Sequence, residues 1–84
     1  LSVRPLMPEE RRQAEVSGGL MVEEVGDGPA ARAGIRPGDI LLSVNGDRVV
    51  SVDQLRNLVG KSGGRLALQI QRDDSRMFVP IRIR

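Results

Sequence analysis

Alternating apolar and polar positions predict strands in five parts of the chain. The most regular alternation lies near the end, where Leu66–Gln71 and Met77–Ile83 flank Asp73-Asp74 and predict a closing hairpin. Leu20–Val25 and Ile40–Val44 are more apolar and predict two further strands. The first run, Leu1 to Arg4, alternates and stops at Pro5, which predicts a short strand.

A change of periodicity predicts one substantial helix after Ser51. Ser51 and Gln54 have the spacing of a capping box, and Gly60 stands where a left-handed residue would end the helix. Pro8–Ala14 and Gly28–Gly34 predict two shorter helical segments, because each has a proline at its start. Between the main helix and the Asn45-Gly46 tight turn, Asp47–Val50 predicts a short additional strand. The elements together predict an α+β fold with five or six strands.

Length and composition limit what such a fold can be. The 84 residues allow one domain with a thin core, and Phe78 is the only aromatic residue in the chain. The absence of cysteine excludes disulfides and thiolate metal sites. No apolar run approaches the roughly 18 residues that a membrane span needs, so we expect no membrane insertion.

The charge pattern does not favour nucleic acid as a partner. The chain has 13 basic and 11 acidic residues, a formal net charge of only +2. Nucleic-acid binders usually concentrate basic residues on one face and add aromatic stacking partners. Here the arginines are scattered along the sequence, and we expect no nucleic-acid partner.

A search for catalytic residues gives no candidate. The chain has no histidine, which excludes the Ser-His and Cys-His pairs. Gly60-Lys61-Ser62 resembles the end of a phosphate-binding loop, but Leu55 stands where that motif needs a glycine. The acidic pairs have local explanations in a helix start, an exposed strand and a turn. We therefore predict a binding domain that has no catalytic residues, metal or cofactor.

The main helix offers one margin for binding. With about 100° between successive helical residues, Leu55 and Leu58 are predicted to enter the core. Val52 and Val59 then line the margin where the helix leaves the core, with Arg56 beside them. This margin becomes a groove if an edge strand runs beside it.

Leu1, Ser2 and Val3 are the best candidates for that edge strand. Leu1 and Val3 would point toward the helix and Ser2 away from it. An extended peptide could then pair with the free strand edge, with alternate side chains entering the groove. The alternative is that the apolar residues of this margin and strand are simply part of the core.

The segment Gly28–Leu41, continuing to Val44-Asn45-Gly46, resembles the signature of bacterial PDZ domains. The signature consists of four short motifs in order: small-Pro-Ala, Ala-Gly-aliphatic, Pro-Gly-Asp-aliphatic and Asn-Gly. The resemblance covers essentially residues 1–84 as one domain. The chain is most similar to the C-terminal, second PDZ domain of HtrA/Deg (Do-type) periplasmic serine proteases, as Phe78-Val79-Pro80-Ile81 suggests. The resemblance implies a small, partly open β-barrel or sandwich capped by helices. Its topology would be the circularly permuted bacterial one, with the groove strand first.

The resemblance also implies a site and a function. It places Leu1, Ser2, Val3, Val52, Arg56 and Val59 in a peptide-binding groove. The glycine-containing loop that holds a ligand carboxylate would precede Leu1, so we expect the chain to be an excised, truncated piece. The implied function is recognition of extended apolar or C-terminal peptide segments in the periplasm for a serine protease. The implied partners are those peptides or unfolded segments, the protease domain and the other PDZ domain.

Two other functions remain open at this point. The domain could instead be a structural module that packs against neighbouring subunits. PDZ domains of membrane-embedded proteases and of secretion-system components would also look similar at this length.

Overall fold

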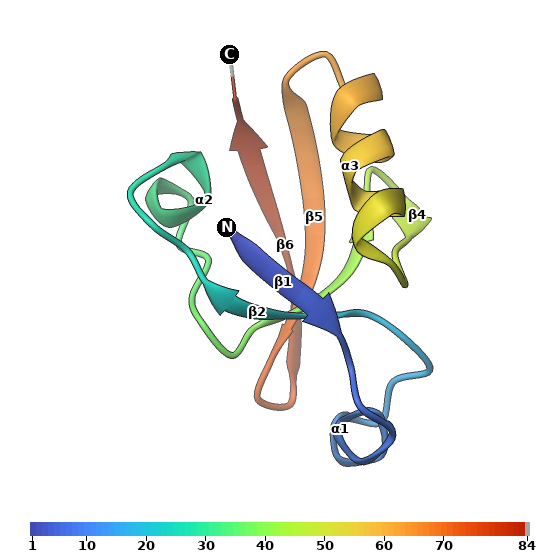
Figure 1. Ribbon diagram of the computed structural model, residues 1–84. Coiled ribbons are helices and arrows are strands. Elements are labelled where there is room, and N and C mark those ends of the chain that lie inside the picture. Colours follow the sequence, from blue (N-terminus) through green and yellow to red (C-terminus); the bar gives the residue numbers. More distant parts are fainter. Residues whose placement is uncertain (84) are drawn as a thin grey trace.

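The computed structural model describes residues 1–83, which form one curled sheet with three helices around it (Figure 1). The strands are β1 (Ser2–Pro5), β2 (Leu20–Glu24), β3 (Ile40–Val44), β4 (Asp47–Arg48), β5 (Arg65–Arg72) and β6 (Ser75–Arg82). The helices are α1 (Pro8–Ala14), α2 (Pro29–Arg32) and α3 (Val52–Lys61).

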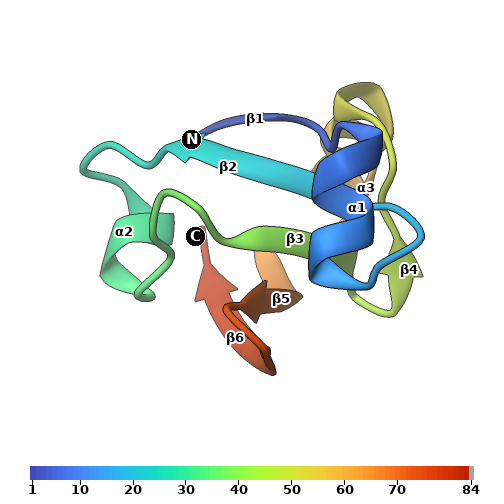
Figure 2. The ribbon, with the colours of Figure 1, turned by 90° about the horizontal axis from the view of Figure 1, so that it is seen from below.

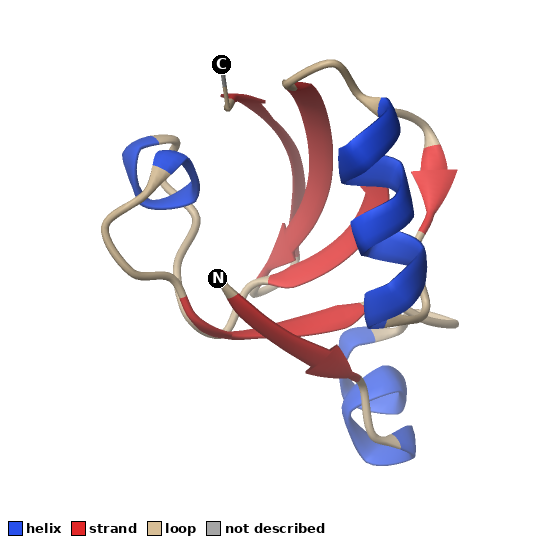
Figure 3. Cartoon of the chain, turned by 45° about the horizontal axis from the view of Figure 1, so that its top comes forward, coloured by secondary structure: helices blue, strands red, loops and turns tan. Residues whose placement is uncertain are grey.

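The sheet is antiparallel throughout, in the order β1-β2-β3-β5-β6, with β4 paired to β3. Seen from below, β5 and β6 run steeply across the direction of β1, β2 and β3 (Figure 2). The strands thus curl around a common interior, with α3 on one side and α2 on another (Figure 3). The predicted α+β class and the partly open arrangement of six strands are confirmed.

The core comes from the inward positions of the alternating strands. Leu20, Val44, Val49 and Ile70 are completely buried, and the rest of the core cluster surrounds them: Val22, Ile35, Leu41, Leu66, Leu68, Val79 and Ile81. All but Val49 and Ile35 lie in strands β2, β3, β5 and β6. An aliphatic core therefore forms without the only aromatic residue, Phe78, whose side chain is exposed.

Three local predictions were wrong in detail. α3 continues through Gly60 to Lys61, and the positive φ angles come later, at Gly63 (68°) and Gly64 (88°). β4 has only two residues: Val49 is buried in the core, and the Val50 amide donates to Gln54 Oε1 in α3. Finally, the predicted capping box is only half present. Ser51 Oγ accepts from the backbone amide of Gln54 at 3.1 Å, but Gln54 Oε1 accepts from the backbone amide of Val50, at 2.8 Å, instead of that of Ser51.

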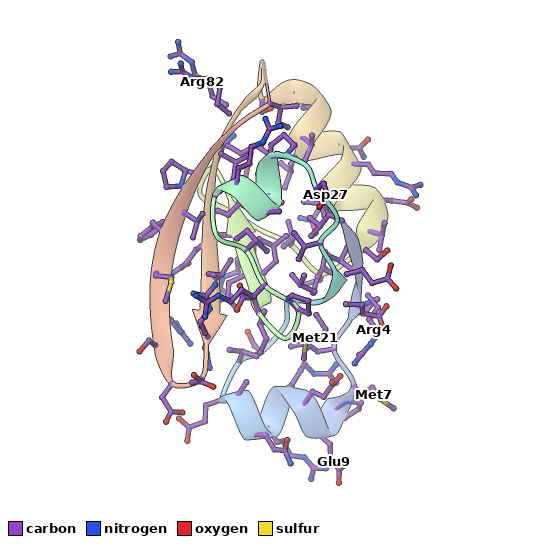
Figure 4. The ribbon with its side chains drawn as sticks, turned by 90° about the vertical axis from the view of Figure 1, so that its left-hand side faces the viewer. Arg4, Met7, Glu9, Met21, Asp27 and Arg82 are labelled. Carbon is purple, nitrogen blue, oxygen red and sulfur yellow. The ribbon has the colours of Figure 1, made fainter. Side chains whose placement is uncertain are left out.

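An ion-pair cluster attaches α1 to the edge of the sheet. Arg4 in β1 donates to both carboxylate oxygens of Glu10, at 2.7 and 2.8 Å, and to Glu23 Oε2 in β2, at 3.2 Å. Glu10 also accepts the amide of Met7 at the helix start, at 2.9 Å. In Figure 4 Arg4 and Met7 lie close to the beginning of α1. The cluster fixes the chain direction where β1 ends.

Candidate functional site

The candidate site lies between β1 and α3, which pack against each other (Figures 1 and 3). β1 pairs with β2 on one side, and within residues 1–83 its second edge has no strand partner. None of the ten residues of α3 is fully buried. An edge strand with free backbone groups thus stands beside a helix whose apolar stripe is only half covered.

A cavity of about 210 Å³ opens at the end of this groove where β1 begins. Its wall is entirely apolar and combines seven parts of the fold: Leu1, Pro29, Ala30, Leu41, Leu55, Val59, Leu66, Leu68, Ile81 and Ile83. A cavity of about 150 Å³ with such a lining can take a benzene-sized group. The pocket therefore has room for about one apolar side chain.

Two of the predicted residues come together at this end of the groove. Leu1 and Val59 line the pocket, while Val3 in β1 is half-buried against the core and does not line it. Ser2 is exposed, and so is Leu1, which nevertheless lines the pocket. Leu1 and Val59 thus face the same cavity.

Val52 and Arg56 lie outside the pocket. Val52, at the first turn of α3, is half-buried and does not line the cavity. The Arg56 side chain is 77% exposed and forms an i,i+3 ion pair with Asp53 at 3.9 Å. An exposed charge such as that of Arg56 contributes little binding energy.

Sequence reasoning missed most of the pocket wall. Leu55 was predicted to enter the core, and it does pack against the core, but it also lines the pocket. Pro29 and Ala30 were predicted as part of a short helical segment and of the family signature, but not as part of a binding pocket. Leu66 and Ile81 were predicted as apolar positions of the closing hairpin, and both line the pocket. Local periodicity shows which side chains point inward but not which of them leave a space.

Contacts with β5 hold α2, and with it Pro29 and Ala30, at the pocket. Arg72 Nη2 at the end of β5 donates to the carbonyl oxygen of Gly34, just after α2, at 2.8 Å. The next residue, Ile35, is buried in the core cluster. One wall of the pocket is therefore held by a hydrogen bond from the far end of the sheet.

A larger depression, of about 420 Å³, lies elsewhere, between the α1–β2 loop and the strands β3 to β6. Its lining mixes charged side chains, such as Arg48 and Arg76, with apolar ones, such as Leu42 and Val50. At its rim the Arg48 carbonyl and the Val50 amide are already bonded to Gln54, at 2.5 and 2.8 Å. The smaller pocket, which adjoins a free strand edge, is the better candidate for binding a chain.

Neither a metal site nor a membrane-spanning helix is indicated by the part of the chain that the structure describes. Residues 1–83 contain no group of three or more His, Cys, Asp or Glu side chains placed to hold a metal ion. None of their helices has the length and apolar content that a membrane span requires.

A strand edge, a half-covered helix and an apolar end pocket define a peptide-recognition type of fold and site. The family profile described as "PDZ domain" matches residues 21–72, and the chain belongs to the PDZ family. The match confirms the family resemblance found from the signature segment.

Among curated proteins the chain is similar to probable periplasmic serine endoproteases of the DegP-like type. It is 39% identical to that of Hahella chejuensis over 99% of this chain and 18% of the relative. It is 38% identical to that of Pseudomonas putida over 69% of this chain and 12% of the relative. The chain thus spans less than a fifth of the length of either relative.

Two solved structures have the same fold. The HtrA3 PDZ domain bound to a phage-derived ligand (FGRWV) superimposes with a TM-score of 0.85 and 31% identity, covering 98% of this chain and 79% of that one. The HtrA-type protease AlgW with a decapeptide superimposes with a TM-score of 0.80 and 25% identity, covering 98% of this chain and 27% of that one.

Proposed function

We propose that this domain binds extended peptides by strand addition to β1 and takes an apolar side chain into the pocket. The observation that carries the proposal is the wholly apolar cavity of about 210 Å³ beside an unpaired strand edge. Burying one Val or Leu side chain there contributes about 1.5–3 kcal/mol. Main-chain hydrogen bonds to β1 supply the rest of the affinity and fix the direction of the peptide.

The proposed contacts divide into two groups. Leu1, Ser2 and Val3 pair with the peptide backbone, while Val59 contacts the side chain in the pocket. Val52 and Arg56 face the preceding peptide residues along the groove, where the exposed Arg56 affects the rate of association more than the affinity. The ligand FGRWV named for the HtrA3 structure supports an apolar residue at the peptide end.

The names of the relatives support a proposal about the parent protein. We infer that the chain is a module of an HtrA/Deg-type serine endoprotease that acts in the periplasm. Its partners there are the protease domain, another PDZ domain and peptides or unfolded segments of substrate proteins. In this arrangement the domain captures substrate and leaves bond cleavage to the protease domain.

A peptide titration followed by amide shifts tests the binding proposal. Peptides that end in Val are added to the labelled domain, and shifts are expected along Ser2–Pro5 and α3. Val59→Lys is expected to abolish them, because it places a charge in the apolar pocket. The matched control is Val50→Lys, since Val50 is exposed and lies outside the groove. Unmoved groove amides at millimolar peptide in a folded domain would refute the proposal.

The strand-addition geometry has its own test. A peptide series is methylated at one backbone nitrogen at a time, which removes one donor without changing the side chains. Because neighbouring residues of a strand point their amides to opposite sides, affinity is expected to fall by roughly 5- to 10-fold at every second position only. Equal losses at all positions would contradict pairing with β1.

A second candidate function is assembly with neighbouring subunits, and one observation favours it. Phe78 on β6 is 71% exposed, and the outward positions next to it on the same strand are Arg76 and Pro80. Aromatic and arginine side chains are enriched in protein interfaces. In the parent protein, Phe78→Ser is expected to weaken assembly in sedimentation experiments and to leave peptide binding intact. Val59→Lys is expected to lose peptide binding and to keep assembly. If Val59→Lys loses assembly and Phe78→Ser does not, the groove itself has the structural role.

A further inference from the structure

The pocket has a rigid floor and an exposed mouth. Leu41, Leu66, Leu68 and Ile81 are all buried and belong to the core cluster. They cannot change in size without a cost in stability of the whole domain. The mouth is different, because Leu1 is 56% exposed and Ile83 is 43% exposed while both line the cavity.

The mouth residues come from the two ends of the fold. The beginning of β1 and the end of β6 lie on the same side of the domain, near α2 (Figures 1 and 2). Ile83 is the first residue after β6, and it lies on the same face as Ile81 because side chains two residues apart in an extended chain share a face. The closing strand therefore carries one buried and one exposed isoleucine into the same pocket.

The backbone of Ile83 is held in place. Its amide donates to the carbonyl oxygen of Gly64 at 2.7 Å, and Gly64 is buried directly before β5. Isoleucine is branched at Cβ, which restricts its χ1 angle and keeps the side chain from swinging aside. Ile83 is thus a stiff part of the wall rather than a flexible cover.

We propose that Ile83 is the residue that sets the size of the side chain accepted by the pocket. This inference rests on the proposed peptide-binding function and adds a selectivity to it. Ile83 occupies space at the mouth of the pocket, so a smaller side chain at this position leaves more room for an aromatic group and a larger one leaves less. Because Ile83 is partly exposed and outside the core cluster, its size can vary without disturbing the fold.

The test compares affinities for four peptides that differ only in their last residue, Ala, Val, Leu or Phe. Ile83→Ala is expected to raise the affinity for the Phe peptide relative to the Val peptide by about 10-fold. Ile83→Phe is expected to shift the preference toward Ala by a similar factor. Val50→Ala removes methyl groups at an exposed position outside this pocket and is the control, with ratios expected to stay within about 2-fold.

The outcomes separate this inference from the function on which it rests. If the wild-type domain binds none of the four peptides, the proposed function fails and the selectivity falls with it. If the wild type binds but both Ile83 variants keep its order of preference, the role of Ile83 is refuted while peptide binding stands. A uniform loss of affinity for all four peptides in Ile83→Ala refutes it as well. Should Ile83→Ala unfold, Ile83→Val removes a single methyl group and is expected to shift the same ratio less.

Discussion

Asp39 and Arg72 form a two-point ion pair that joins the start of β3 to the end of β5. Arg72 Nε donates to Oδ1 at 2.8 Å and Nη2 to Oδ2 at 2.7 Å, and Asp39 is only 2% exposed. Burial alone would raise the pKa of Asp39, but hydrogen bonds from Arg72 and from the Arg36 amide outweigh it and hold this pKa below its usual value. The Pro-Gly-Asp part of the signature is therefore an anchor for the α2 side of the pocket.

Removing the charge of Asp39 is expected to destabilise the domain. Asp39→Asn keeps the size of the side chain but leaves Arg72 with a weaker, neutral acceptor, and we expect a loss of about 3 kcal/mol in the free energy of unfolding. Urea denaturation followed by circular dichroism measures it. The control is Asp27→Asn, because Asp27 is exposed at the surface (Figure 4), and a change within about 0.5 kcal/mol is expected there. Equal effects of the two variants would contradict the anchor role.

Stability is expected to fall in acid. Hydrogen bonds from Arg4 and from the Met7 amide lower the pKa of Glu10 from the usual 4.5 to about 2, and the pKa of Asp39 is lowered as well. The folded state thus holds both carboxylates charged at a pH where the unfolded chain binds protons. The contribution of Glu10 is present above about pH 4.5 and is lost as the pH falls toward about 2, and the contribution of Asp39 is likewise lost in acid.

The urea midpoint measured across this pH range tests the acid dependence. Glu10→Gln is expected to show a smaller decrease than the wild type, since the variant has no carboxylate to protonate at the Arg4 cluster. Glu9→Gln, one residue earlier on the exposed side of α1, is expected to follow the wild-type curve. A Glu10→Gln curve as steep as that of the wild type would show that the cluster does not carry the effect.

Asn45 is expected to matter for more than its turn. Its φ of 51° fits the tight turn after β3, and its side chain also bonds to β5, accepting from the Ala67 amide at 2.7 Å and donating to the Arg65 carbonyl at 3.3 Å. Asn45→Ala is expected to cost about 2 kcal/mol in the free energy of unfolding. Asn45→Gly also lacks these side-chain bonds, but glycine adopts the positive φ without strain. It is therefore expected to be about 0.5–1 kcal/mol more stable than Asn45→Ala. Recovery of the full wild-type stability by glycine would mean that the side-chain bonds contribute nothing.

Two glycine substitutions are expected to have opposite signs. Gly60 lies inside α3 with nothing within 4 Å of an added Cβ, so Gly60→Ala should stabilise the domain. The expected gain is about 0.5–1 kcal/mol, from helix propensity and a less disordered unfolded chain. Gly19 has a φ of 120°, and an added Cβ would lie 3.0 Å from Ile40 Cγ2 and 3.1 Å from the Leu41 carbonyl oxygen. Gly19→Ala should therefore destabilise by about 2 kcal/mol, as thermal unfolding of the two variants would measure.

The end of α3 could not be predicted correctly from the sequence, which placed it at Gly60. A glycine near the end of an amphipathic run has the right spacing for a helix end, and the start at Ser51 was located correctly from the same kind of signal. The end was misplaced because Gly63 and Gly64, which turn the chain into β5, set it instead. Both glycine sites are compatible with the local pattern, and the position of β5 decides between them.

The sequence by itself determined the elements, the inward face of each strand and the family. Those properties depend on residues close together in the chain, such as the alternation in Leu66–Gln71 or the ordered signature after Gly28. Only the tertiary structure decided that Leu1, Leu55 and Ile83 share one pocket, and that Asp39 meets an arginine 33 residues away. The physical reason is the curl of the sheet, which brings distant segments together and is not encoded in the periodicity of any one of them.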